Sequence, residues 1–261
     1  MPFTFAHPAA VLPLRRFKSL HTAALMVGSV APDLSYYVPA KYTNGAFLES
    51  HTAMGAIYID LPVGLVTLLI GFLLRRPLTA LMSPRARALC LQSLERFREQ
   101  PRYWLWVPLA LYVGTWTHIA WDSLTHDRGW IVLRVSALSA PITLGWYTGT
   151  VCHVLQYVSS VAGLLILAIW YLRLPTPAAM EPPNTVPMAT SARVAILALV
   201  LTIGLAIGGF VAMRAAAMGT TNYHVFYLML TRSIAWCGLL YLGAGLLVMR
   251  SRRKPELLPE V

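Results

Sequence analysis

Charged side chains are scarce in this sequence. Of its 261 residues, 12% are Asp, Glu, Lys or Arg and 57% are hydrophobic, whereas domains that fold in water carry about 25% charged residues. The deficit extends along the whole chain, which excludes a soluble domain with a single anchor. The composition therefore predicts an integral membrane protein.

Cysteine is also rare. Cys90, Cys152 and Cys237 are odd in number, lie far apart and lack CxxC spacing, which argues against a disulfide framework and against a cysteine-based zinc site. The sequence has no GxSxG elbow, P-loop or GxGxxG motif, so the common hydrolase and nucleotide-binding signatures are missing. No short apolar core with basic and small-residue flanks opens the chain, and we expect no removable signal peptide.

Acidic residues are outnumbered, with 10 Asp and Glu against 21 Lys and Arg. The basic residues lie beside apolar segments and without a basic–aromatic module, which argues against nucleic-acid binding. Because basic residues next to membrane spans mark the cytoplasmic side, we expect a multi-pass protein of the bacterial inner membrane with a cytoplasmic C-terminus. The residues concerned are Arg75, Arg76, Arg85, Arg87, Arg96, Arg98 and Arg102 in one loop, and Arg250, Arg252, Arg253 and Lys254 after the last apolar segment.

Five segments have the length of about 20 mostly apolar residues that a membrane span requires. They predict an all-α polytopic membrane helical bundle of five to six spans, plus short N-terminal interfacial or re-entrant helices. Residues 19–31 are apolar but short, and they would form either the sixth span or one of these short helices. The five segments are residues 53–74, 103–121, 151–172, 194–213 and 226–249.

Proline divides the chain into parts. Residues 175–190 contain five prolines and no apolar periodicity, which is typical of a linker. This linker separates a membrane domain rich in His and Asp, residues 1–174, from a C-terminal transmembrane helix pair, residues 191–261. The glycine-rich stretch "IGLAIGGF" in that pair favours close helix packing.

Ionisable side chains gather at the end of the second apolar segment. His118, Asp122 and His126 are spaced i, i+4, i+8, so a regular helix would place all three on one side. An imidazole and a carboxylate one turn apart can share a divalent metal ion. Gly129 follows soon after, which leaves open whether the helix stays regular as far as His126.

Other candidate ligands occur earlier in the chain. Counting membrane crossings places Asp33 and His51 on the same outer side as the helical pair, and His7 joins them if residues 19–31 do not cross. Ionisable groups at membrane depth are costly and usually face one another or a cavity, and a metal is a natural partner for them. The predicted site holds a divalent metal ion, zinc in the first place, with Asp33 or His126 as acid or base. The predicted ligands are His7, Asp33, His51, His118 and Asp122.

Interpretations without a metal ion or a catalytic role remain open for these residues. A histidine at a helix end is more often a hydrogen-bonded interfacial residue, and the whole set can form a polar network without metal. Asp127 and Arg128 are typical of a solvated loop end. His153 is compatible with a hydrogen-bonding or substrate-contact role. Asp60 and Arg232, both inside apolar segments, could pair, or Arg232 could snorkel alone.

The motifs resemble those of a bacterial family of multi-pass membrane proteins of unknown function. The resemblance covers residues 1–172 and is carried by "MPFTFAHPAAVLPL", "GSVAPDLSYY", "SHTAMG" and "HIAWDSLTH". The order His, Pro-Asp, Ser-His, His-x-x-x-Asp is also similar to membrane-bound metal-dependent hydrolases and, more distantly, to zinc-dependent phospholipase C proteins. "PDLSYY" and "ESHTAM" offer fewer ligands than the hydrolase pattern has at those places.

This resemblance implies a metal-dependent hydrolase at the outer face of the inner membrane. Its expected substrate is amphiphilic, a lipid or lipid-linked phosphoester, and membrane lipids are its expected partners. The alternative is a non-enzymatic membrane protein, a transporter or assembly factor, with a structural metal or polar site. A transporter typically has polar groups or broken helices near mid-membrane, and the third and fourth apolar segments have few.

Overall fold

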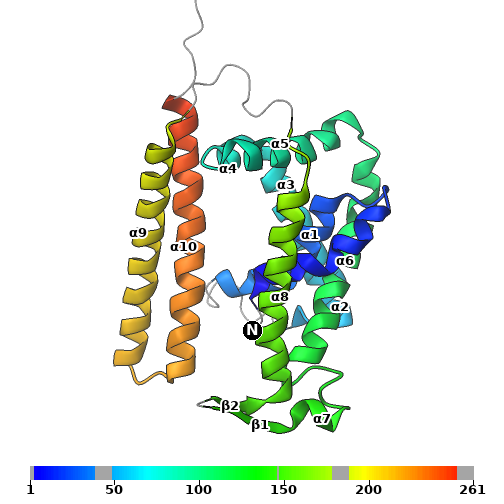
Figure 1. Cartoon of the computed structure of the whole chain (residues 1–261), viewed down its shortest axis with the longest axis vertical. Coiled ribbons are helices and arrows are strands. Elements are labelled where there is room, and N and C mark those ends of the chain that lie inside the picture. The colour runs from blue at the N-terminus through cyan, green and yellow to red at the C-terminus, as the bar shows by residue number, and fades with distance from the viewer. Residues whose placement is uncertain (1–2, 39–48, 146, 178–187, 252–261) are drawn as a thin grey trace, which may run out of the picture. The chain divides into compact units, whose positions relative to one another are not determined.

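The computed structural model describes residues 3–38, 49–145, 147–177 and 188–251 (Figure 1). The described chain is all-α except for one antiparallel hairpin, in which β1 (Pro141–Leu144) pairs with β2 (Tyr147–Thr150). It divides into two compact units. The first comprises Met1–Ser35, Ala40–Leu69 and Phe97–Pro175, and the second comprises Tyr36–Pro39, Ile70–Arg96 and Thr176–Val261.

Four helices among the described residues are long and apolar enough to cross a membrane. The first, Ala53–Leu73, joins the short helix α2 (Ala53–Gly55), the π-helical turn η5 (Ala56–Asp60) and α3 (Leu61–Leu73). The others are α8 (Val151–Arg173), α9 (Thr190–Ala217) and His224–Ser251, which makes up most of α10 (Asn222–Ser251). The predicted class of all-α membrane protein is therefore confirmed.

The predicted count of five to six spans is not confirmed. The segment expected as the second span forms the 23-residue helix α6 (Tyr103–Thr125), but its Trp, Tyr, Thr, His and Asp residues make it less apolar than the other four helices. The possible sixth span, residues 19–31, contains the nine-residue helix α1 (Thr22–Val30). A helix of that length is only about 14 Å long, whereas the hydrocarbon core is about 30 Å thick.

Helix α6 forms the centre of the first unit. Its buried residues recur every three or four positions and form one stripe along the helix. Helix α1 packs on this stripe, and the 3-10 helix η1 (Thr4–Arg16) contacts α1, α6 and α8. The stripe consists of Val107, Ala110, Leu111, Gly114, Thr115, His118, Asp122 and Thr125.

Glycines allow α1 and α6 to approach very closely. A Cβ atom on Gly28 would overlap the carbonyl of Leu111, and a Cβ atom on Gly114 would overlap the carbonyl of Leu25. At the crossing, Thr115 Oγ1 donates a hydrogen bond of 3.2 Å to the carbonyl of Gly28. Such small-residue contacts are a common means of packing helices in membranes. The crossing brings the C-terminal end of α1 to the polar half of α6.

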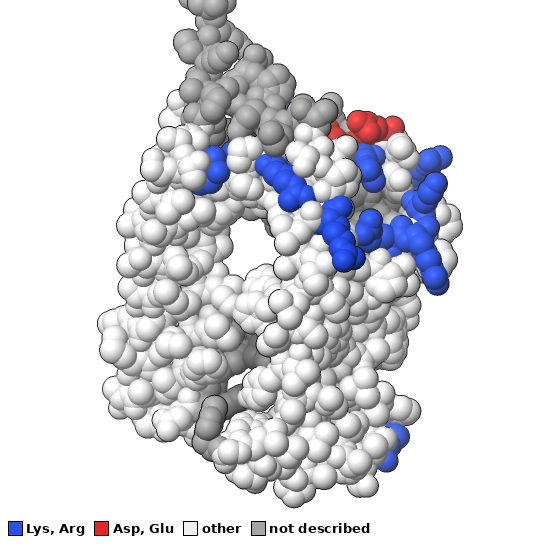
Figure 2. All heavy atoms as spheres, viewed as in Figure 1, with Lys and Arg blue, Asp and Glu red and all other residues white. Residues whose placement is uncertain are grey.

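The second unit contains α4 (Arg75–Thr79), most of α5 (Pro84–Glu99) and the antiparallel pair α9 and α10. Gly204 and Gly208 of α9 leave room for side chains of α10, so the stretch "IGLAIGGF" lies at a close helix contact. The hydroxyl of Tyr241 donates a hydrogen bond of 2.9 Å to the carbonyl of Leu78, which joins α10 to α4. Figure 2 shows Lys and Arg side chains over the α4–α5 segment.

The units do not follow the predicted domain boundaries in every part. Residues 70–96 fall within the predicted His- and Asp-rich membrane domain, residues 1–174, but they group with the C-terminal helix pair, because α4 packs on α10. Most of the predicted linker, residues 178–187, lies outside the described residues.

The close crossing of α1 and α6 predicts that adding one methyl group at Gly114 destabilises the fold. Gly114→Ala should lower the free energy of unfolding by about 1–3 kcal/mol, because the new Cβ meets backbone atoms that cannot move aside cheaply. Gly71→Ala is the control, since its Cβ would meet nothing within 4 Å. Thermal unfolding in detergent, followed by circular dichroism, measures both. Equal midpoints for the two variants would contradict this packing.

Candidate metal centre

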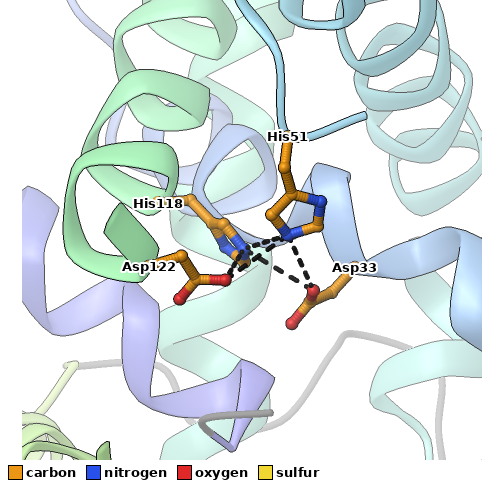
Figure 3. Close-up of side chains that lie close together, drawn as sticks. All are labelled: Asp33, His51, His118 and Asp122. Atoms are coloured by element: carbon orange, nitrogen blue, oxygen red, sulfur yellow. Dashed lines mark hydrogen bonds and ion pairs between the residues drawn. The ribbon is translucent and has the colours of Figure 1, made fainter. Parts of the chain in front are cut away.

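Four of the predicted site residues meet in the first unit (Figure 3). Asp33 comes from the 3-10 helix η2 (Ala31–Tyr37), His51 from the turn before α2, and His118 and Asp122 from α6. Asp33, His118 and Asp122 are buried, whereas the side chain of His51 is 29% exposed. The site is therefore open to solvent mainly at His51.

The donor atoms are close enough to share one ion. The Nε2 atoms of His51 and His118 are 3.3 Å apart. Asp122 Oδ2 lies 3.2 Å from His118 Nε2 and 3.4 Å from His51 Nε2. Asp33 Oδ1 lies 3.5 Å from each of these nitrogens. Tetrahedral zinc with bonds of about 2.0–2.1 Å separates its donors by about 3.3–3.4 Å, so the spacing of these atoms fits such an ion.

The two imidazole rings are oriented by contacts on their outer nitrogens. His118 Nδ1 lies 2.8 Å from the carbonyl of Ser29. Because a carbonyl only accepts, a neutral ring must carry its proton on Nδ1 and direct the lone pair of Nε2 into the cluster. His51 Nδ1 lies 3.0 Å from the hydroxyl of Ser50. Partners of this kind orient metal-binding histidines in proteins.

The two carboxylates are held in the same way. Thr4 Oγ1 donates a hydrogen bond of 2.6 Å to Asp33 Oδ2, which leaves Oδ1 facing the histidines. His7 Nε2 lies 3.0 Å from Asp122 Oδ1, which leaves Oδ2 facing them. Each of the four residues thus presents one donor atom to the cluster and holds another outside it.

His7 was predicted as a ligand, but it is not one of the four. Its Nε2 contacts the outer oxygen of Asp122, its Nδ1 lies 3.2 Å from the carbonyl of Thr4, and its ring stacks on that of His118 at 3.8 Å. Both polar partners are acceptors, so a neutral His7 can satisfy only one of them. His7 therefore lies where it orients the Asp122 carboxylate and does not itself face the cluster.

His126 lies at the edge of the cluster. Helix α6 ends at Thr125, and His126 has extended backbone angles, so the i+8 spacing does not continue the helical face. Its Nδ1 nevertheless lies 3.2 Å from the carbonyl oxygen of Asp122 and 3.5 Å from Asp122 Oδ2. The side chain is 33% exposed, and burial lowers the pKa of His126.

A tight turn places His51. Thr52 caps the following helix by accepting a hydrogen bond of 3.0 Å from the backbone N–H of Gly55. A Cβ atom on Gly55 would overlap the carbonyl of Glu49, so glycine lets the chain fold back on itself here. His51 is thereby fixed at the entrance to the span Ala53–Leu73.

Asp60 follows in the π-helical turn of that span. It is 1% exposed, and neither carboxylate oxygen has a hydrogen-bond partner among the described residues. Arg232, for which the sequence leaves open a pairing with Asp60 or snorkelling alone, donates a hydrogen bond of 3.0 Å from Nη1 to the carbonyl of Tyr37 within the second unit. Irregular π-turns often occur at functional sites, and an intramembrane carboxyl group is costly to keep.

Without a metal ion, protons bridge the cluster. Burial alone would raise the pKa of Asp33, but hydrogen bonds with His118 and His51 outweigh it and hold that pKa well below its ordinary value. Burial would likewise lower the pKa of His51, but hydrogen bonds with Asp122 and Asp33 raise it to about 9. A divalent cation entering the site would therefore displace at least one proton.

The groups that support these four residues, Thr4, Ser29 and Ser50, are not predicted from the sequence, because a hydroxyl or a backbone carbonyl has no recognisable metal-binding spacing. The one sequence signal for two of them is that Thr4 stands three residues before His7 and Ser50 immediately before His51.

The fold and the cluster define an all-α membrane protein with a group of His and Asp side chains able to hold a metal ion. The chain belongs to the family described as a domain of unknown function (DUF4184), which matches residues 1–249. The match extends beyond the motif-bearing residues 1–172 into the C-terminal helix pair. No curated protein and no solved structure was found to match the chain.

The protonation of His51 predicts how metal binding varies with pH. Since the pKa of His51 is raised to about 9, a cation competes with its proton at all lower pH values. Between pH 6 and pH 8 the apparent affinity for zinc should rise up to about tenfold per pH unit for each proton displaced. Calorimetric titration in buffers of different ionisation enthalpy counts the protons released. Affinity independent of pH, with no proton release, would exclude His51 as a ligand.

Proposed function

We propose that this protein is a membrane-bound metal-dependent hydrolase that acts on an amphiphilic phosphoester, a lipid or a lipid-linked compound. The observation that carries the proposal is the convergence of two imidazole nitrogens and two carboxylate oxygens from three separate segments. The two nitrogens lie 3.3 Å apart, and each lies 3.2–3.5 Å from one oxygen of each carboxylate. Three of the four residues are buried.

The chemistry of the donors favours zinc. Two carboxylates neutralise a divalent cation, which offsets the cost of burying charge. Structural zinc sites are built largely from cysteine, whereas several catalytic sites combine histidine with a carboxylate or use histidine alone. Bound zinc would supply a nucleophile at neutral pH by lowering the pKa of water to about 7. Asp33, His51, His118 and Asp122 would hold the ion.

Residues of the chain would perform the remaining steps. His51 forms the solvent-exposed side of the cluster, so substrate would enter there. His126 is partly exposed and its Nδ1 contacts two acceptor oxygens of Asp122, so a neutral ring carries its proton on Nδ1. The lone pair of Nε2 would then accept a proton from the attacking water, as a general base. Asp33, oriented by Thr4, would serve as a ligand, because its lowered pKa makes it a weaker general base than His126.

The membrane orientation follows from α6 and the basic segment before it. We infer that α6 is a fifth span and that α1 is too short to be a sixth. His118 stands 15 residues after Tyr103, about 22 Å along the helix, while Arg102 and the arginines before it would lie on the cytoplasmic side. The cluster would then lie just inside the outer edge of the hydrocarbon core of the bacterial inner membrane, which is about 30 Å thick. Lipids are the available substrates there, and the C-terminus would be cytoplasmic.

One observation favours a second function. All four donors come from the protein and three are buried, as in structural metal sites that leave no open position. On this alternative the protein is non-enzymatic, a transporter or assembly factor, and the ion fastens η2 and the His51 turn to α6.

Three variants separate these functions. His118→Ala and Asp122→Asn should lose the zinc ion of this site and all hydrolysis of phospholipid in mixed micelles, because the first removes a donor atom and the second removes the negative charge of a ligand. His126→Ala should keep zinc and lose about 10²–10⁴-fold in kcat, the usual contribution of a proton-transferring group. His224→Ala, in α10, is the matched control and should keep both. Zinc content is measured by elemental analysis.

The outcomes differ clearly. Loss of zinc from both donor variants, with a parent protein that hydrolyses neither phospholipids nor soluble phosphodiesters, would overturn the enzyme and support the structural ion. Zinc content equal to that of the parent in both variants would overturn the site itself.

A further inference from the structure

A second group of metal-binding side chains lies where the loop after α6 meets the start of α8. Asp127 belongs to that loop, and Cys152 and His153 are the second and third residues of α8. His153 Nε2 lies 3.0 Å from Asp127 Oδ2, and Cys152 Sγ donates to Asp127 Oδ1 at 3.4 Å. One donor atom from each residue lies within 4.8 Å of the other two.

The surroundings of this trio leave one side open. Cys152 is 0% exposed, whereas the side chains of Asp127 and His153 are 58% and 36% exposed. Thr150, the last residue of β2, contacts both Cys152 Sγ at 3.1 Å and Asp127 Oδ1 at 3.4 Å. The hairpin therefore fixes the thiol and the carboxylate together, and solvent reaches the remaining side.

The donor types select a class of cation. A thiolate is a soft ligand that magnesium and calcium do not prefer, while thiolate, imidazole and carboxylate together suit zinc or cobalt. Three protein ligands with one open position is an arrangement found in zinc sites. One thiolate and one carboxylate also neutralise a divalent charge.

The geometry argues against a thiol nucleophile. In a cysteine-based enzyme the sulfur contacts the histidine that activates it. Here Cys152 and His153 both contact Asp127 instead, so the carboxylate stands between two groups that each bind metals.

We propose that Asp127, Cys152 and His153 bind a second borderline-soft divalent cation, such as zinc, separately from the four-residue cluster. Its effect would be to fasten the loop after α6 to α8. His126 immediately precedes Asp127 and contacts Asp122, so the second ion would hold in place the residue that borders the first site. The proposal does not require the protein to be a hydrolase.

Cobalt distinguishes the two sites in the full-length protein. A Co²⁺–thiolate bond gives an intense charge-transfer absorption in the near ultraviolet, and the first site, with nitrogen and oxygen donors only, gives none. The parent protein should show this band and bind two cobalt ions. Cys152→Ser should lose the band and bind one ion. Asp122→Asn should lose one ion and keep the band.

Two further variants keep the test decisive. His153→Ala removes a partly exposed side chain, should leave folding intact and should weaken the band-forming site at least about tenfold. Cys237→Ser, in α10 where the sulfur faces Gly204 of α9, should leave the band unchanged. A parent protein without the band, or a band that persists in Cys152→Ser, would overturn the proposal and leave the trio as a hydrogen-bonded junction.

Discussion

Two carboxylates and two imidazoles that lie side by side, three of the four buried, require a positive charge among them. Removing ionised groups from water is costly unless they are paired, and Asp33 and Asp122 lie within 3.5 Å of the same two histidine nitrogens. Protons can supply this charge, as the raised pKa of His51 shows, and a divalent cation supplies it in one step. The rest of the first unit serves this arrangement. The glycine crossing brings the carbonyl of Ser29 to His118, η1 brings Thr4 to Asp33, and the turn at Gly55 returns His51 to the cluster.

Site residues whose contacts are close in the sequence could be predicted, whereas those whose contacts are far apart in the sequence were harder to predict. The His118–Asp122 pair is local, since i and i+4 share a helix face, and the sequence predicts it directly. Asp33 and His51 required a charge-based count of crossings together with motif resemblance, because nothing local joins them to α6. His7 was included for the same reasons, but only the packing of η1 shows that it orients Asp122 rather than facing the histidines.

Other features could not be predicted because they depend on long-range packing. The number of spans was expected from apolar length alone. Helix α6, however, buries His118 and Asp122 in its stripe of buried residues, and it is less apolar than the four helices that are long and apolar enough to cross a membrane. Asp127 was interpreted as a solvated loop end, and Cys152 was discounted for lack of CxxC spacing. They meet only because the loop folds back over 25 residues to the start of α8. The two groups of donors are linked through adjacent residues, since His126 borders the first and Asp127 belongs to the second.

X-ray absorption spectroscopy at the zinc edge tests the four-residue cluster most directly, with Cys152→Ser used to remove the thiolate of the second site. The account predicts about four nitrogen and oxygen scatterers at about 2.0–2.1 Å, together with the outer-shell scattering of two imidazole rings, and loss of one ring signal in the additional variant His51→Ala. A spectrum of oxygen scatterers alone, or one unchanged by removal of His51, would show that the ion is held elsewhere and would contradict the account.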